Sequence, residues 1–151
     1  MTLGGLEATG TSTVGLVIVS HSPHLARCAV EMTQEILPGL VAPHAVVAGN
    51  TAGGLGTDAT EVAGAIMRLI GAGCEDVLIL CDIGSSVMSA DMARDFLAPG
   101  LAGRTHLSEA PLLEGLVAAW AASAVGLSLD LVRDRTAQAA TLKADQVRAL
   151  R

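Results

Sequence analysis

The sequence contains almost no aromatic residues. Of its 151 residues only Phe96 and Trp120 are aromatic, and tyrosine is absent. Proteins that bind single-stranded nucleic acids stack the bases on aromatic side chains, so this chain lacks the residues for such a platform. Its formal net charge of −6 gives the same indication, because nucleic acids and anionic membranes are bound through basic surfaces. We therefore expect neither kind of partner.

Cysteine is also scarce, and its spacing does not suit a disulfide framework or a metal site. Cys28, Cys74 and Cys81 form no CxxC motif, and their odd number favours reduced thiols packed as small core residues in a cytoplasm. The first basic residue is Arg27, so no charged leader precedes the apolar run at residues 14–19. That run is too short to cross a bilayer. These features predict a cytoplasmic protein with no membrane insertion and no metal site.

Short apolar runs alternate with segments of helical periodicity along most of the chain. We expect strands at residues 14–19, 44–49 and 76–81 and a weaker fourth strand at 104–108. The intervening segments read as helices, at residues 23–37, 58–70, 87–97 and 110–124. This alternation predicts an α/β fold, a single three-layer domain with a mostly parallel central sheet. In the first helix, Leu25, Ala29, Met32 and Ile36 share one face, which we expect to be buried.

The two ends of the chain differ from this central pattern. Residues 1–13 are rich in Gly and Thr without periodicity, and we expect a flexible tail there. Residues 14–127 form the predicted domain. Residues 128–151 read as a basic, solvated C-terminal helical extension.

Three polar or glycine-rich segments follow the predicted strands: "SHSP", "NTAGGLGT" and "DIGSS". Ligands of open parallel sheets bind at the carboxyl ends of the strands, so these segments are the expected site. His21 and Asp82 end strands that could be neighbours, and a carboxylate beside an imidazole fixes its tautomer. Ser22 and Pro23 start a helix whose N–H groups suit an anion. Together these residues predict phosphoryl chemistry with His21 as the nucleophile.

Each of these residues also has a purely structural interpretation. A histidine at the end of a strand can simply hydrogen-bond a turn, and Asp82 can cap the next helix. His24 is expected on an exposed helical turn, and His44 and His106 are expected to be structural or solvated. The "GGLG" segment lacks the Lys and Ser/Thr of a phosphate-binding P-loop.

Four motifs taken in order resemble a known family. They are "LVIVSHSPHLA", "GGLGTDATEVAGAI", "CDIGSSVMSADMA" and "EAPLLEGLVAA", and together they cover about residues 14–126. The chain resembles the phosphotransferase subunits of dihydroxyacetone kinases that depend on the phosphoenolpyruvate phosphotransferase system (PTS). That family is related to the mannose-class IIA components, whose fold is flavodoxin-like.

The resemblance implies a complete pathway for the phosphoryl group. It implies that His21 accepts the group from the phosphocarrier protein HPr and passes it to ADP bound to a partner kinase subunit, for dihydroxyacetone phosphorylation. Asp82 would orient the imidazole, and Ser22, Gly56, Thr57, Gly84 and Ser85 would surround the phosphate. No cofactor is expected on this subunit, because Mg-ADP or Mg-ATP belongs to the partner. A homodimer is also implied.

Two other functions stay open. A mannose-class sugar IIA component would use the same nucleophile and donate to a IIB protein instead. A non-catalytic regulatory module that senses phosphate could use the same loops without any nucleophile.

Overall fold

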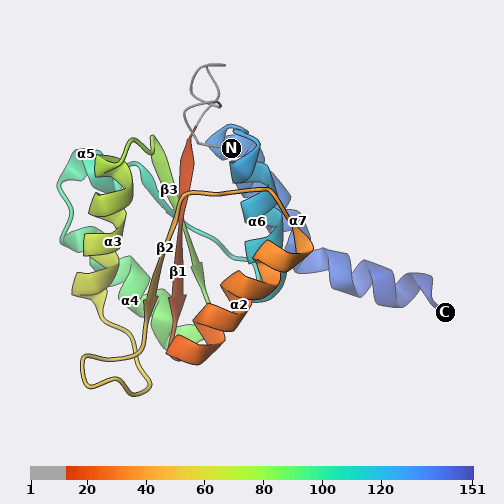
Figure 1. The fold of residues 1–151 in the computed structure, drawn as a ribbon, viewed down its shortest axis with the longest axis horizontal. Coiled ribbons are helices and arrows are strands. Elements are labelled where there is room, and N and C mark those ends of the chain that lie inside the picture. Colours follow the sequence, from red (N-terminus) through yellow and green to blue (C-terminus); the bar gives the residue numbers. More distant parts are fainter. Residues whose placement is uncertain (1–12) are drawn as a thin grey trace.

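Four parallel strands form the middle layer of the molecule (Figure 1). The structure, a computed structural model, describes residues 13–151, so the tail predicted for residues 1–13 lies outside the described residues except for Thr13. The strands follow the spatial order β2-β1-β3-β4, and their bounds are β1 (Val14–Ser20), β2 (His44–Ala48), β3 (Asp76–Cys81) and β4 (Thr105–Leu107). These bounds agree with the predicted strands to within about one residue at each end, which is within the usual disagreement between assignments.

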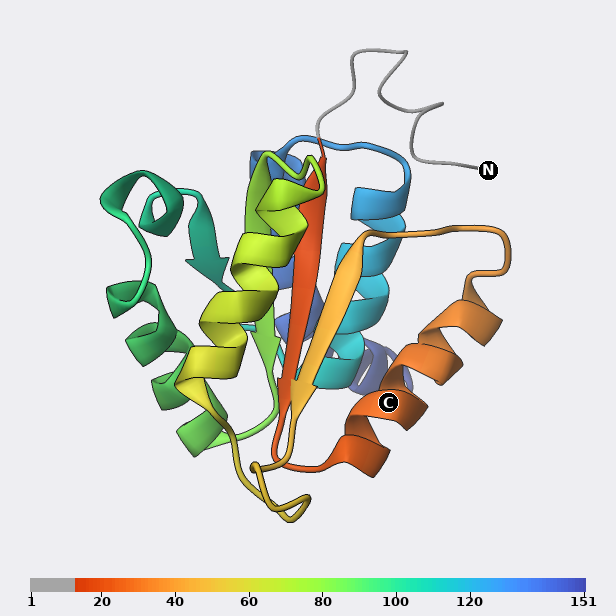
Figure 2. The ribbon, with the colours of Figure 1, turned by 60° about the vertical axis from the view of Figure 1, so that its left-hand side comes forward.

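Helices cover both faces of this sheet (Figures 1 and 2). One face carries α2 (Pro23–Ile36), α6 (Leu112–Ala124) and the start of α7 (Leu129–Ala149). The other face carries α3 (Ala59–Gly71) and α4 (Gly84–Asp95), with the short α5 (Pro99–Ala102) before β4. The predicted three-layer α/β fold and its C-terminal helix are therefore confirmed. The last turns of α7 extend beyond the sheet, and their side chains are exposed.

The central strand β1 shows why the sheet needs two helical layers. All seven of its residues are buried, and its side chains alternate between two separate cores. Leu16 and Ile18 pack towards α2 and α6, whereas Val17 and Val19 pack towards α3 and α4. Burying each such side chain contributes about 1.5–3 kcal/mol, so β1 is anchored on both faces. A strand held in this way presents its carboxyl end at a fixed position.

The predicted buried face of α2 is wrong. Leu25, Met32 and Ile36 are exposed, and of the expected residues only Ala29 is buried. The helix instead turns a face of small or short side chains inwards, made of Ala26, Ala29, Val30 and Thr33. A period of 3.6 residues fits both faces, and only the distance at which α2 packs against the sheet selects between them. Small side chains let α2 approach the sheet closely, which leaves its larger apolar residues in solvent.

The helix after β3 begins earlier than predicted. The sequence indicated a start near Val87, whereas α4 begins at Gly84. Glycine and serine are weak helix formers, so the sequence pattern places them in a loop. As a result Gly84, Ser85 and Ser86 form the first turn of α4 rather than a flexible connection.

Gly49 gives a test of the loop that follows β2. It has φ +77°, and an added Cβ would lie 2.9 Å from both the Gly54 carbonyl oxygen and Pro23 Cγ. Gly49→Ala is therefore expected to lower the free energy of unfolding by about 1–3 kcal/mol, through strain and overlap. Gly53→Ala is the matched control, because Gly53 has φ +84° but open space around its Cα. Urea unfolding measures both, and an equal loss in the two variants would contradict the role of the close contact.

Candidate functional site

The three predicted loops meet at the carboxyl edge of the sheet (Figure 2). The arrowheads of β1 and β2 point to the same edge, where the connections to α2, α3 and α4 gather. Backbone hydrogen bonds tie these connections together: Asp82 N–H donates to the Val19 carbonyl, and Gly49 N–H donates to the Ser20 carbonyl. Every residue that the sequence singled out for the site therefore belongs to one edge of the molecule.

The histidine and the aspartate are in direct contact, as their positions on neighbouring strands predicted. His21 Nδ1 lies 2.8 Å from Asp82 Oδ1. Both side chains are largely buried, since 19% of the His21 side chain and 12% of the Asp82 side chain are exposed. β1 and β3 run side by side in register, which places the residues after each strand next to one another. The pairing of these strands creates the contact.

Three further groups hold the Asp82 carboxylate in place. The Ser20 hydroxyl donates to Oδ2 at 2.9 Å, the His21 backbone N–H donates to Oδ2 at 2.8 Å, and the Ile83 backbone N–H donates to Oδ1 at 2.7 Å. Burial alone would raise the pKa of Asp82, but these backbone hydrogen bonds and the one to the His21 ring outweigh it and keep the pKa well below its usual value. Asp82 is therefore an ionised acceptor at neutral pH.

An ionised acceptor determines the tautomer of the His21 ring. Because the carboxylate can only accept, Nδ1 carries the proton and donates it to Asp82. Nε2 then carries the lone pair of the ring, and this lone pair accepts a hydrogen bond from the Ser85 hydroxyl. Nε2 is thus the nucleophilic atom of the ring, an assignment that the sequence alone did not make.

Ser85 belongs to a helix N-terminus that has no side-chain cap. The residue before α4 is Ile83, which offers no capping oxygen to the first turn. Helix N-termini leave N–H groups without intrahelical partners, and these groups together with the helix dipole favour a bound anion. The Ser86 N–H bonds the Ile83 carbonyl, so the Gly84 and Ser85 N–H groups are the candidate donors for an anion at this turn.

The N-terminus of α2, which the sequence favoured as the anion site, is largely satisfied. Ser22 is its N-cap, and its hydroxyl accepts from the Leu25 N–H at 3.2 Å. The Ala26 N–H bonds the Ser22 carbonyl, and Pro23 has no N–H to offer. The start of α2 therefore has few free donors, and the expectation that Ser22 and this helix start bind the phosphate stays a prediction.

The glycine-rich loop after β2 supports the histidine from the other side. Gly56, at φ +142°, uses its N–H to bond the His21 carbonyl at 3.1 Å, so this N–H holds the loop and is not free for a phosphate. Thr57 contacts Ser89 of α4 through their hydroxyls at 2.5 Å. The side chain of Asn50 shapes the loop itself by accepting from the Ala52 and Gly54 N–H groups.

Ser20, Asn50 and Ser89 are the site residues that the sequence analysis missed. Ser20 is the last residue of β1 and is completely buried, with its hydroxyl on Asp82 and its oxygen accepting from the Ser22 N–H at 3.1 Å. A serine at the end of an apolar strand is a detectable signal, since a buried hydroxyl needs a partner. Asn50 and Ser89 carried no such signal before the loops were seen together.

The remaining candidates lie apart from this constellation. His24 is exposed in the first turn of α2, as expected. His44 Nδ1 hydrogen-bonds the Ala42 carbonyl at 2.9 Å, and its ring packs against Trp120. His106 lies on β4, and its Nε2 is 3.6 Å from Asp76 Oδ1.

The cysteines were expected in the core, and this holds for Cys74 and Cys81 but is wrong for the exposed Cys28. Burial, and to a lesser extent the nearby Asp82 charge, raise the pKa of the Cys81 thiol to about 11. Cys81 therefore stays protonated at neutral pH and is a poor nucleophile, although it directly precedes Asp82.

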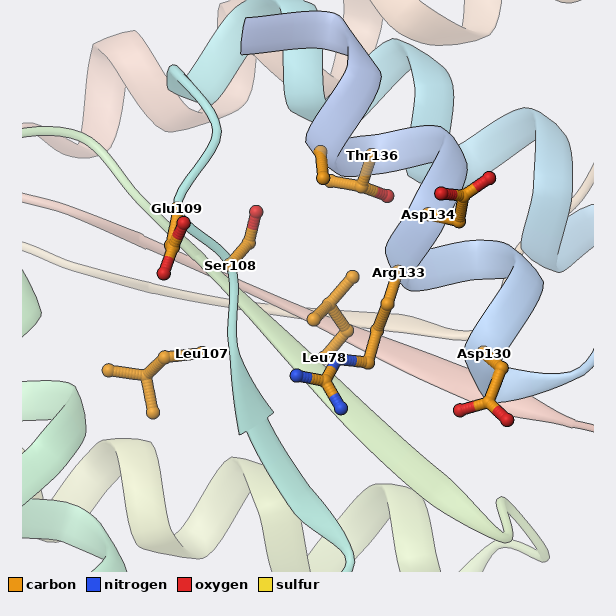
Figure 3. A pocket seen from close by; sticks show the side chains of 9 residues that line it. Leu78, Leu107, Ser108, Glu109, Asp130, Arg133, Asp134 and Thr136 are labelled. Carbon is orange, nitrogen blue, oxygen red and sulfur yellow. The ribbon is translucent and has the colours of Figure 1, made fainter.

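A pocket of about 350 Å³ opens between the end of β4 and α7 (Figure 3). Ser108, Glu109, Arg133 and Asp134 are among the side chains that line it, and none of its lining residues belongs to the His21 site. Within residues 13–151 no group of three or more His, Cys, Asp or Glu side chains is placed to hold a metal ion. Across the same residues, no helix combines the length and hydropathy that a membrane span needs.

The low pKa of Asp82 predicts a specific loss of stability in acid. A carboxyl with a folded pKa below its unfolded value of about 3.9 contributes stability that is present above that value and is lost as the pH falls towards the folded pKa. Asp82→Asn is expected to lose less stability than the wild type between pH 6 and about pH 3. Urea unfolding at the two pH values measures this, and equal losses in both proteins would contradict it.

Known proteins are similar to this chain in both sequence and fold. The family model for the PTS system fructose IIA component, of the EIIA-man type, matches residues 15–132, which is most of the chain. The chain belongs to this family. The family resemblance inferred from the four motifs is thereby confirmed.

Curated relatives of this IIA family member share its sequence over most of its length. A phosphoryl donor subunit (DhaM) of PEP-dependent dihydroxyacetone kinase from Providencia stuartii is 36% identical over 138 residues, which are 89% of this chain and 28% of the relative. The Escherichia coli K12 protein of the same name is 38% identical over 79% of this chain and 25% of its own length. This chain thus spans about a quarter of these relatives.

A shorter relative matches over most of its own length. The phosphoryl donor subunit of PEP-dependent dihydroxyacetone kinase 2 from Listeria innocua is 34% identical over 79% of this chain and 93% of its own length. Among solved structures, a protein of unknown function superposes on this IIA domain with a TM-score of 0.75 and 26% identity, covering 83% of this chain and 94% of its own.

Proposed function

We propose that this chain is the phosphoryl donor subunit of a PEP-dependent dihydroxyacetone kinase and carries the phosphoryl group on His21 Nε2. The observation that carries this proposal is the arrangement of the ring, with Nδ1 on the Asp82 carboxylate and Nε2 facing Ser85 at the uncapped start of α4. A nucleophilic nitrogen is thereby placed beside groups that favour an anion. The Listeria innocua relative supports the assignment, since 93% of its length matches this chain.

The proposed reaction is a direct transfer between two histidines. The Nε2 lone pair of neutral His21 attacks the phosphorus of phosphorylated HPr in line, a new P–N bond forms, and the P–N bond of the donor breaks. The donor imidazole leaves with the electron pair of the broken bond. The His21 ring keeps its proton on Nδ1 and gains positive character, which the ionised Asp82 stabilises. In the onward step an oxygen of the terminal phosphate of ADP attacks the phosphorus in line, a P–O bond forms, the P–N bond to His21 breaks, and Nε2 recovers its electron pair.

The residues around Nε2 have separate proposed roles. Ser85 turns its hydroxyl from Nε2 to a phosphoryl oxygen, and the first N–H groups of α4, including that of Gly84, hold the others. Gly56, Thr57 and Ser22 act by fixing the loops, as their existing hydrogen bonds indicate. The acceptor is ADP on a partner kinase subunit, so Mg²⁺ and nucleotide belong to that subunit and none is needed here. We also propose that the protein is cytoplasmic and forms a homodimer.

Phosphorylation of protein labelled with ¹⁵N-histidine tests the assignment to Nε2. Incubation with phosphoenolpyruvate, enzyme I and HPr should add one acid-labile phosphoryl group, and NMR should place it on Nε2 of His21. Addition of the kinase subunit with ADP should then remove it. A label on Nδ1 or on another residue would contradict the site. Transfer to a sugar IIB protein with none to ADP would identify a mannose-class IIA component instead, and no uptake at all would favour a regulatory module.

A further inference from the structure

Ser20 is the only residue of β1 with a polar side chain, and it is completely buried. Burying a hydroxyl costs free energy unless the hydroxyl is hydrogen-bonded. The other residues of β1 are apolar or glycine, and an apolar side chain at the last position would avoid this cost. The contacts of the Ser20 hydroxyl must therefore explain why a serine stands there.

The Ser20 hydroxyl bonds to the carboxylate and to the backbone beside the nucleophile at the same time. Its Oγ donates to Asp82 Oδ2 at 2.9 Å and accepts from the Ser22 N–H at 3.1 Å. The Ser22 carbonyl oxygen also lies 3.2 Å from Oγ, but the hydroxyl has one proton, and the charged carboxylate is the closer and stronger acceptor. One buried atom thus joins Asp82 to the backbone on the far side of His21.

The four donors around Asp82 are divided evenly between its two oxygens. Oδ2 accepts from the Ser20 hydroxyl and from the His21 N–H at 2.8 Å. Oδ1 accepts from His21 Nδ1 at 2.8 Å and from the Ile83 N–H at 2.7 Å. Without the Ser20 hydroxyl, Oδ2 keeps a single donor and the Ser22 N–H loses its acceptor. Both sides of the contact between the imidazole and the carboxylate would then lose support together.

We infer that Ser20 is a positioning residue that acts through Asp82. Its hydroxyl holds the carboxylate and the turn at residues 20–22 in the geometry that keeps the His21 proton on Nδ1. Ser20 itself does not reach the phosphoryl group, because its side chain is completely buried and its hydroxyl is occupied by Asp82 and Ser22. The inference rests on the proposed function for its effect on the rate of transfer.

Ser20→Ala tests this role. Single-turnover phosphoryl transfer from saturating phosphorylated HPr should slow by about 10- to 100-fold, the range known for lost outer partners of metal-binding histidines. The KM for HPr should be unchanged, because no surface group is altered. Ser123→Ala is the matched control, since Ser123 is also buried and its hydroxyl donates to the Val14 carbonyl at 2.5 Å, at the opposite end of β1. That variant should keep the wild-type rate.

Three further measurements distinguish positioning from a general loss of structure. ¹⁵N NMR of the unphosphorylated protein should show the His21 proton partly on Nε2 in Ser20→Ala, and on Nδ1 in the wild type and in Ser123→Ala. Ser20→Thr should restore most of the rate, because threonine keeps a hydroxyl and suits a strand. In an Asp82→Asn background, Ser20→Ala should add little further loss, because the two residues act as one unit.

The outcomes separate this inference from the proposed function. An unchanged tautomer in Ser20→Ala would overturn the inference whatever the rate, and so would equal rates in Ser20→Ala and Ser123→Ala. A Ser20→Thr variant as slow as Ser20→Ala, or a full additional loss in the Asp82→Asn background, would also overturn it. In each case, uptake from HPr by the wild type leaves the proposed function standing. If the wild type takes up no phosphoryl group, the proposed function fails, and the tautomer measured without HPr still decides the role of Ser20.

Discussion

His21→Ala is expected to accept no measurable phosphoryl group from HPr, a loss of at least about a thousandfold, because it removes the only nucleophile of the proposed reaction. Nε2 is the ring atom with the lone pair, and it contacts the Ser85 hydroxyl at the uncapped start of α4. The ring also contributes only one of the hydrogen bonds on Asp82, so the Ser20, His21 and Ile83 donors keep the carboxylate in place in the variant. The measurement is incorporation of labelled phosphate after incubation with enzyme I, HPr and phosphoenolpyruvate.

His24→Ala is the matched control for this experiment. His24 lies three residues away, on an exposed turn of α2, and is expected to leave the rate of incorporation within about twofold of the wild type, as is usual for an exposed side chain. Acid-labile label that persists in His21→Ala and disappears in His24→Ala would overturn the assignment of the nucleophile.

Asp82→Asn is expected to slow phosphoryl transfer by about 10²- to 10⁴-fold, the range in which loss of a tautomer-fixing aspartate disables other catalytic histidines. An asparagine amide can donate a hydrogen bond to Nδ1, which moves the ring proton to Nε2 and removes the nucleophilic lone pair. The positive charge that develops on the phosphorylated ring also loses its counter-charge. Single-turnover transfer from labelled HPr measures the rate of the chemical step.

The control for Asp82→Asn is the same substitution on an exposed aspartate of α4. Asp91 is exposed and lies 3.8 Å from Arg94, and the Asp91→Asn variant should keep the single-turnover rate at saturating HPr. A tautomer effect also has a spectroscopic signature, because ¹⁵N shifts of the His21 ring should report the proton on Nε2 in Asp82→Asn and on Nδ1 in the wild type. An unchanged tautomer together with a normal rate would contradict the role of Asp82.

The sequence predicted the strands better than the helix faces. Continuous apolar runs such as residues 76–81 fit only a strand covered on both sides, so their bounds were clear. The predicted buried face of α2 was wrong because two faces share the same periodicity. Only the close approach of small residues to the sheet selects one of them. The start of α4 was predicted too late along the chain because Gly84, Ser85 and Ser86 have weak helix propensity. In the structure their position after β3 outweighs this propensity.

The sequence by itself determined the order of strands and helices along the chain and the three loops of the site. It placed His21 and Asp82 at the ends of strands that could be neighbours, because parallel strands have their carboxyl ends at one edge, and the pairing of β1 with β3 in the structure brings the two side chains into contact. Only the tertiary structure decided which ring nitrogen is nucleophilic and which helix start faces it. Those two choices depend on hydrogen bonds between segments about 60 residues apart, from Ser20 and His21 to Asp82 and Ser85, and no local pattern encodes them.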